Sequence, residues 1–173
     1  MISRLEQISP MNVVNGREPL AIPLNVAEWV DADLLKTWVM EEVETLEWGN
    51  PDLQKYLQAH PDFQPKALLS LLIYAYATGV LESEEIVATL MRTPDLRQLW
   101  RGPGPSMKEI GRFRKENRAL MKWGIVQLLR RALQHKLNLG ETRLPSGLRQ
   151  ALVDSAVERL DLARHMDRAA QGA

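Results

Sequence analysis

The stretch KALLSLLIYAYATG, residues 66–79, decides the fold that we expect of this chain. Its side chains are almost all apolar, and a helix that is apolar all round is typical of the centre of a helical domain. Gly79 follows the apolar run and favours the left-handed conformation that ends many helices. The run is interrupted by Ser70 and Thr78 and is too short to span a bilayer. We therefore predict a central buried helix in a protein that does not enter a membrane.

Apolar residues at helical spacing continue on both sides of this stretch. We predict further helices over residues 31–48, 83–92, 93–100, 106–133 and 144–170. Their starts are marked by Asp31, Ser83, Thr93, Ser106 and Ser146. Alternating β-branched runs are absent, so the predicted fold class is all-α. We expect a helical bundle with a helix-turn-helix-like unit and a long basic helix.

The chain divides into three predicted parts. Residues 1–26 contain Pro10, Pro19 and Pro23 with polar spacers, which indicates an extended arm. Residues 27–140 form the helical domain, and residues 141–173 a C-terminal amphipathic helix. The apolar stripe of that last helix consists of Leu148, Leu152, Ala156 and Leu160.

The composition excludes several classes of site. The 173 residues include no cysteine, which excludes disulfides, thiolate metal sites and a cysteine nucleophile. The three histidines, His60, His135 and His165, are too far apart in sequence to give a metal-ligand spacing. We recognise no glycine-rich phosphate loop and no catalytic constellation, so we expect no enzymatic activity, no cofactor and no metal. The N-terminus lacks the apolar core of a signal peptide, which predicts a cytoplasmic protein.

The formal net charge is zero, but the charges are separated along the chain. Residues 1–95 contain six Lys or Arg against fifteen Asp or Glu, residues 96–136 contain eleven against two, and the remaining tail contains five of each. Such asymmetry is typical of a polyanion-binding segment beside an acidic body. Composition leaves an alternative open, in which the acidic part packs on the basic part and neutralises it within the molecule.

The cations concentrate in SMKEIGRFRKENRALMKWGIVQLLRRAL, residues 106–133, which we predict to be one helix. Ser106 and Glu109 form the pattern of a capping box, which fixes the helix start. Arginine can read guanine with two hydrogen bonds, lysine mostly contacts phosphate, and a helix N-terminus itself attracts phosphate. We therefore expect double-stranded DNA as the partner. The candidate DNA-binding residues are Lys108, Arg112, Arg114, Lys115, Arg118 and Lys122.

Three ordered patterns accompany this segment. The first comprises Pro65, Leu68, Leu69, Leu71, Leu72, Tyr74, Ala75, Tyr76 and Gly79, followed by Ser83 and Ile86; the second Leu96, Arg97 and Trp100; the third Ile110, Arg112, Phe113 and Arg114. In this order they resemble the N-terminal helical domain of bacterial insertion-sequence transposases of the DDE class. The resemblance covers roughly residues 65–139 and implies a helical DNA-binding role, as in that family's end-recognition module.

The chain departs from this family after Gly140. The family continues into a strand with the first metal-binding aspartate of a ribonuclease-H-like domain, whereas residues 141–160 here predict a helix. Without the domain that holds two Mg²⁺ ions, we expect no cutting or joining of DNA. The resemblance thus implies a transposase-derived DNA-binding protein without nuclease activity. It would modulate transposition or serve as a DNA-binding subunit of a larger complex.

A second function class stays open at this point. The chain could be a protein-interaction module whose basic helix is neutralised by its own acidic half or by a partner. The family usually carries basic residues where Glu84 and Glu85 stand, which leaves room for this alternative. A protein partner would then dock on the predicted helices that contain residues 41–48 and 83–90 or on the C-terminal helix, through which a second copy of the chain would also pair. Exposure of Trp38, Trp48 or the stripe of that helix in one apolar patch would favour this class.

Overall fold

The computed structural model describes residues 8–11, 20–46, 51–59, 64–98, 100, 102–139 and 144–171. These residues are mostly helical, which confirms the all-α class. The strands are β1 (Ile8–Met11) and β2 (Leu20–Ile22), followed by the short 3₁₀ helix η2 (Val26–Glu28). The helices are α1 (Ala32–Glu44), α2 (Pro51–Ala59), α3 (Pro65–Ala77), α4 (Ser83–Arg92), α5 (Pro94–Gln98), α6 (Met107–Glu116), α7 (Arg118–Lys136) and α8 (Ser146–Gln171).

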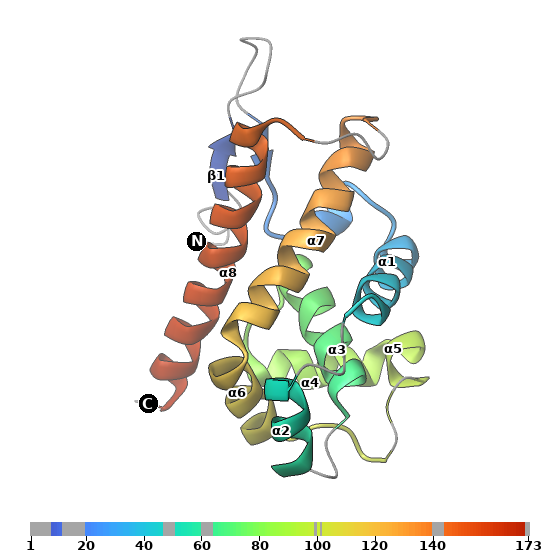
Figure 1. Cartoon of the computed structure of the whole chain (residues 1–173), viewed down its shortest axis with the longest axis vertical. Helices are drawn as coiled ribbons and strands as arrows, with labels where there is room; N and C mark the ends of the chain where they lie inside the picture. Colours follow the sequence, from blue (N-terminus) through green and yellow to red (C-terminus); the bar gives the residue numbers. More distant parts are fainter. Residues whose placement is uncertain are drawn as a thin grey trace.

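Helix α3 is the central helix predicted from residues 66–79. Leu68, Leu69, Leu72 and Ile73 are completely buried, because α1, α4, α5 and α7 all pack on this helix (Figure 1). Gly79 ends the helix with a φ of 80°, a conformation that side chains with a Cβ rarely adopt. The prediction of a central buried helix stopped by this glycine is confirmed.

Helix α7 packs closely against α3 at Gly124. A Cβ atom at Gly124 would lie 2.2 Å from Cδ1 of Ile73, so the two helices approach at a distance that only glycine permits. Around this contact Met121, Ile125 and Leu128 are fully buried, as the predicted apolar stripe requires. The sequence therefore places a glycine where a Cβ atom would collide with the Ile73 side chain.

Helix α8 runs along α7 and shares the same hydrophobic core (Figure 1). Its predicted stripe is buried there: Leu148, Leu152, Ala156 and Leu160. Ile22 and Val26 from the N-terminal segment belong to that core as well. The described residues thus surround one core, to which all three predicted parts of the chain contribute.

The basic segment is two helices rather than the single helix that we predicted. α6 ends at Asn117, whose backbone leaves the helical region (φ −124°, ψ 37°) and whose Nδ2 donates to the carbonyl oxygen of Phe113. The apolar side chains of α6, Ile110 and Phe113, are buried where α6 packs on α4, whereas α7 packs on α1, α3 and α8. One straight helix could not satisfy both sets of contacts, so the chain turns between them.

Two further predictions need correction. Ser83 does not cap α4: Glu82 occupies that position without a side-chain hydrogen bond, and the Ser83 hydroxyl is used elsewhere. The arm over residues 1–26 contains an antiparallel pair of strands, β1 and β2, which pattern reading missed because β2 has only three residues. Helix α8 packs against β1, and this contact supplies the long-range support that short strands need.

A buried arginine joins three of these elements. Arg159 of α8 is completely buried and donates to the carbonyl oxygens of Tyr76, at 2.9 Å, and Pro23, at 2.8 Å. It also donates to the carbonyl oxygen of Leu24 and to Ser155. Burial lowers the pKa of Arg159 to about 10, because the charged form loses its hydration. This side chain ties α8 to the end of α3 and to the segment before η2.

Candidate nucleic-acid interface

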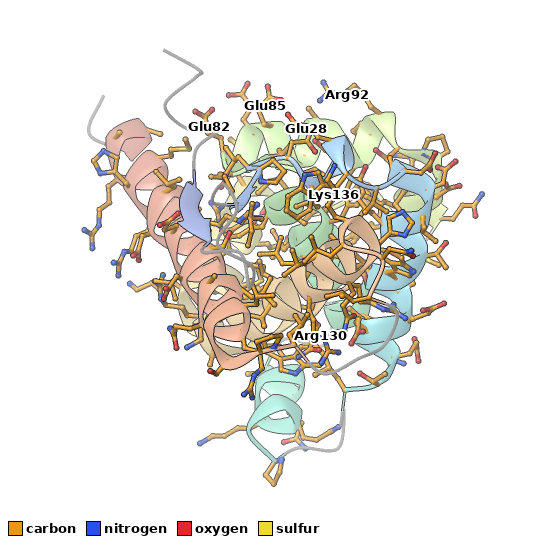
Figure 2. All side chains as sticks on the ribbon, turned by 90° about the horizontal axis from the view of Figure 1, so that it is seen from above. Glu28, Glu82, Glu85, Arg92, Arg130 and Lys136 are labelled. Carbon is orange, nitrogen blue, oxygen red and sulfur yellow. The ribbon has the colours of Figure 1, made fainter. Side chains whose placement is uncertain are left out.

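The charges of the protein remain spatially separated on part of its surface. Figure 2 shows Glu28, Glu82 and Glu85 together along one edge of the molecule, with Arg130 well away from them. Among these, Glu85 forms an ion pair with Arg92, at 3.6 Å. Arg92 lies on the same edge, and Lys136 of the basic segment lies nearer to Glu28 than Arg130 does, so the charges are separated only in part (Figure 2).

Partial neutralisation occurs at the interface of α1 and α7. Arg131 of α7 forms ion pairs with Glu41, at 2.8 Å, and Glu42, at 3.5 Å. Its guanidinium also lies over the ring of Trp38, 5.4 Å from the ring centroid. Arg131 is thus one cation of residues 96–136 that the acidic half does neutralise.

Three of the six candidate DNA-binding residues are exposed lysines. Lys108 and Lys115 lie on α6, and Lys122 lies on α7. None of them forms an ion pair with any other residue that the structure describes. No carboxylate of the described residues therefore competes for their ammonium groups.

Arg112 lies between the two lysines of α6. Positions 108, 112 and 115 follow each other by four and three residues, so they share one face of the helix. The Arg112 side chain is half-buried, and its Nε is buried without a hydrogen-bond partner among the described residues. We define the basic surface as Lys108, Arg112, Lys115 and Lys122.

The start of α6 is built as the capping pattern predicted. The hydroxyl oxygen of Ser106 accepts a hydrogen bond from the backbone N–H of Glu109, at 3.1 Å. This bond satisfies one of the N–H groups that a helix leaves unpaired at its first turn. It fixes the end of the helix from which Lys108 projects.

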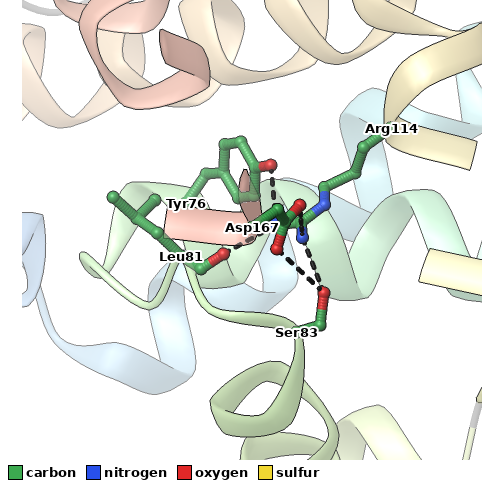
Figure 3. A network of polar contacts seen from close by, with 5 residues as sticks. All are labelled: Tyr76, Leu81, Ser83, Arg114 and Asp167. Carbon is green, nitrogen blue, oxygen red and sulfur yellow. Dashed lines mark hydrogen bonds and ion pairs between the residues drawn. The ribbon is translucent and has the colours of Figure 1, made fainter. Parts of the chain in front are cut away.

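Arg114 is buried and is not part of the basic surface, so our prediction of Arg114 as a DNA contact needs correction. Figure 3 shows its guanidinium enclosed by Tyr76, Leu81, Ser83 and Asp167. Nη1 donates to the hydroxyl of Tyr76 at 3.0 Å and to the carbonyl oxygen of Leu81 at 2.6 Å. Nη2 donates to the Ser83 hydroxyl at 2.7 Å and pairs with the Asp167 carboxylate. DNA could reach this guanidinium only if the fold opened.

The same network perturbs Tyr76. Burial raises the pKa of Tyr76 to about 12, because the phenolate would lose its hydration, although the neighbouring Arg114 partly opposes this. The hydroxyl therefore stays protonated at neutral pH and accepts the hydrogen bond from Arg114. We name the set Tyr76, Leu81, Ser83, Arg114 and Asp167 the Arg114 network.

Arg118 is paired as well, but at the surface. Its Nη2 lies 2.6 Å from Oδ1 of Asp161 on α8, and Nη2 of Arg164 lies 3.3 Å from the same oxygen. Sequence reasoning missed Arg164, because it lies on another helix more than forty residues away from Arg118. The signal available in the sequence was its three-residue spacing from Asp161, which allows an ion pair within one helix.

The predicted helix-turn-helix unit is not confirmed. α6, the helix expected to enter a groove, does contact α4. The two are joined by residues 93–106, which include α5, whereas a helix-turn-helix has a turn of three or four residues. The packing of α6 on α4 is therefore not set by a short turn between the two helices.

The described residues contain neither a candidate metal site nor a candidate membrane span. Within the described ranges no group of three or more His, Cys, Asp or Glu could hold a metal ion. In the same ranges no helix combines the length and apolar character needed to cross a membrane. Comparisons with protein-family models, with curated proteins and with solved structures find no match to this chain.

Proposed function

We propose that this protein binds double-stranded DNA through the basic surface on α6 and α7. One observation carries the proposal: the lysines of that surface are exposed and form no ion pair with a described residue, while Arg114 and Arg131 in the same segment are neutralised internally. The resemblance noted above agrees with this role. In it the chain is a transposase-derived DNA-binding protein without nuclease activity, acting on transposition or as a subunit of a larger complex.

The chemistry of the surface suits phosphate rather than base edges. Three of its four members are lysines, which act as point charges and contact phosphate more than they distinguish bases. Each neutralised phosphate releases counterions, so the logarithm of the binding constant should fall with that of the salt concentration, with a slope of about −0.9 per contact. Four contacts predict a slope of about −3 to −4.

The alternative, a protein-interaction module, is supported less well, because the C-terminal stripe on which it partly depended is not at the surface. Leu148, Leu152 and Leu160 are buried in the core of the protein. Trp38 is partly buried between Arg131 and His135, and Trp48 lies outside the described residues. We therefore do not advance this alternative.

A charge-reversal experiment tests the proposal. Binding of the full chain to a fluorescent duplex of random sequence is measured by anisotropy over a salt series. Lys108→Glu/Lys115→Glu should weaken binding by more than about 30-fold and flatten the salt slope by about 2. Lys55→Glu/Lys136→Glu is the matched control: these lysines are also exposed, and the net charge changes equally. Equal losses in both variants, or no binding by the wild type at low salt, would refute the proposal.

A further inference from the structure

We infer that Asp161 is a built-in competitor for DNA phosphate, and that Arg118 and Arg164 form a two-arginine phosphate site which Asp161 occupies in the unbound protein. This inference rests on the proposed function and extends the basic surface from α6 and α7 onto α8. It assigns a regulatory role to a carboxylate and a binding role to Arg164.

The geometry places both guanidinium groups around one oxygen atom. Oδ1 of Asp161 accepts from Nη2 of Arg118 at 2.6 Å and lies 3.3 Å from Nη2 of Arg164. The two Nη2 atoms are consequently no more than about 6 Å apart, since both contact the same atom. A phosphate group, with its several acceptor oxygens, can accept hydrogen bonds from two arginines at this separation.

Because the cluster is exposed, little free energy is needed to replace the Asp161 carboxylate by a phosphate. The side chains of Arg118, Asp161 and Arg164 are 39%, 50% and 56% exposed. Ion pairs at such positions contribute only about 0–1 kcal/mol, because water and salt screen both partners. A phosphate can therefore displace Asp161 without loss of a large stabilising interaction.

The position of the cluster makes it continuous with the basic surface. Arg118 is the first residue of α7, and Lys122 lies four residues later, one turn along the same face. Lys115 precedes Arg118 by three residues, on the other side of the turn at Asn117. A DNA backbone in contact with Lys122 therefore lies within one helical turn of Arg118.

A competitor can be recognised because its removal increases binding. Asp161→Asn removes the carboxylate charge and keeps the size of the side chain. We expect it to raise the affinity for a duplex up to about 5-fold, because phosphate no longer has to displace a carboxylate whose exposed ion pairs contribute about 0–1 kcal/mol. The salt slope should stay unchanged, because the wild type already makes this phosphate contact. The same change in the Arg118→Gln/Arg164→Gln background should give no such increase. Circular dichroism confirms that each variant is folded.

Asp154→Asn is the matched control. Asp154 is an exposed residue of the same helix, it accepts a hydrogen bond from Gln150 at 2.9 Å, and it forms no ion pair with a described residue. The substitution changes the net charge by the same amount and should alter affinity less than twofold.

The outcomes separate this inference from the proposed function. If Asp161→Asn and Asp154→Asn raise affinity equally, only overall charge matters and the competitor role is refuted, while DNA binding by the basic surface stands. If Asp161→Asn still raises affinity when both arginines are replaced, the two-arginine site is refuted. If neither the wild type nor Asp161→Asn binds DNA at low salt, the proposed function fails and the inference fails with it.

Discussion

Arg114 and Arg118 are four residues apart in the sequence, and each pairs with an aspartate of α8, yet the structure gives them opposite surroundings. The Arg114 side chain is 6% exposed and its partner Asp167 is 29% exposed, whereas Arg118 and Asp161 are 39% and 50% exposed. Arg114 also has Tyr76, Leu81 and Ser83 as partners. A charged side chain is therefore accessible to an external anion only if no other part of the fold encloses it.

The two pairs also differ in what they contribute to stability. Removal of one partner from a buried ion pair with additional hydrogen bonds is strongly destabilising, because the charge and acceptors that remain are at best partly rehydrated. An exposed pair can exchange its partner for water at little cost. Single substitutions in the two regions should therefore differ in their effects on the free energy of unfolding.

Removal of the buried arginine should have the largest effect. Arg114→Ala leaves Asp167 without its ion-pair partner and leaves the Leu81 carbonyl oxygen without its donor from α6. The free energy of unfolding should fall by about 3–5 kcal/mol. Urea unfolding followed by circular dichroism measures this. A loss below about 1 kcal/mol would show that the Arg114 network does not support the fold.

Titration of the buried tyrosine should have the next largest effect. The pKa of Tyr76 is about 12 in the folded protein and about 10 when unfolded, so the folded state holds its proton longer. Its contribution to stability is complete below pH 10 and is lost as the pH rises toward 12. Two pKa units correspond to about 2.7 kcal/mol. The stability advantage of the wild type over Tyr76→Phe in urea unfolding should shrink by about 2 kcal/mol between pH 10 and 12, most of the full amount. Parallel pH profiles for the two proteins would contradict the assignment.

Loss of the serine hydroxyl should have a moderate effect. Ser83→Ala removes the acceptor that Arg114 Nη2 approaches at 2.7 Å and the donor to Asp167 at 3.3 Å. A hydrogen bond to a charged group contributes about 1.5–3 kcal/mol, and the better helix propensity of alanine offsets a few tenths. We expect a net loss of about 1–2 kcal/mol in thermal or urea unfolding. Ser146→Ala, at an exposed serine that begins α8, is the control and should change stability by less than about 1 kcal/mol.

Removal of the surface arginine should affect stability least. Arg118→Ala should reduce the free energy of unfolding by less than about 1 kcal/mol, because its pair with Asp161 is exposed. It should nevertheless weaken DNA binding several-fold, since one phosphate contact is lost. Urea unfolding and anisotropy on the same protein preparation separate the two effects. A large loss of stability would show that Arg118 supports the fold in the same way as Arg114.

Much of the fold could be predicted from residue patterns. The apolar run of α3, the glycine after it, the caps at Asp31 and Ser106 and the stripe of α8 each depend on residues close together in the chain. Such local signals determine where a helix begins, which face is apolar and where it ends. The short strands and the turn at Asn117 escaped prediction, because long-range packing selects them.

The candidate site was predicted less completely, for the same physical reason. The sequence by itself determined that residues 96–136 carry a large excess of cations and that the helices around them have buried apolar faces. Only the tertiary structure decided which cations remain at the surface. It buries Arg114 against Asp167, brings Arg164 beside Arg118 and leaves Lys108, Lys115 and Lys122 exposed. Burial and pairing depend on contacts between helices distant in sequence, and no local pattern records them.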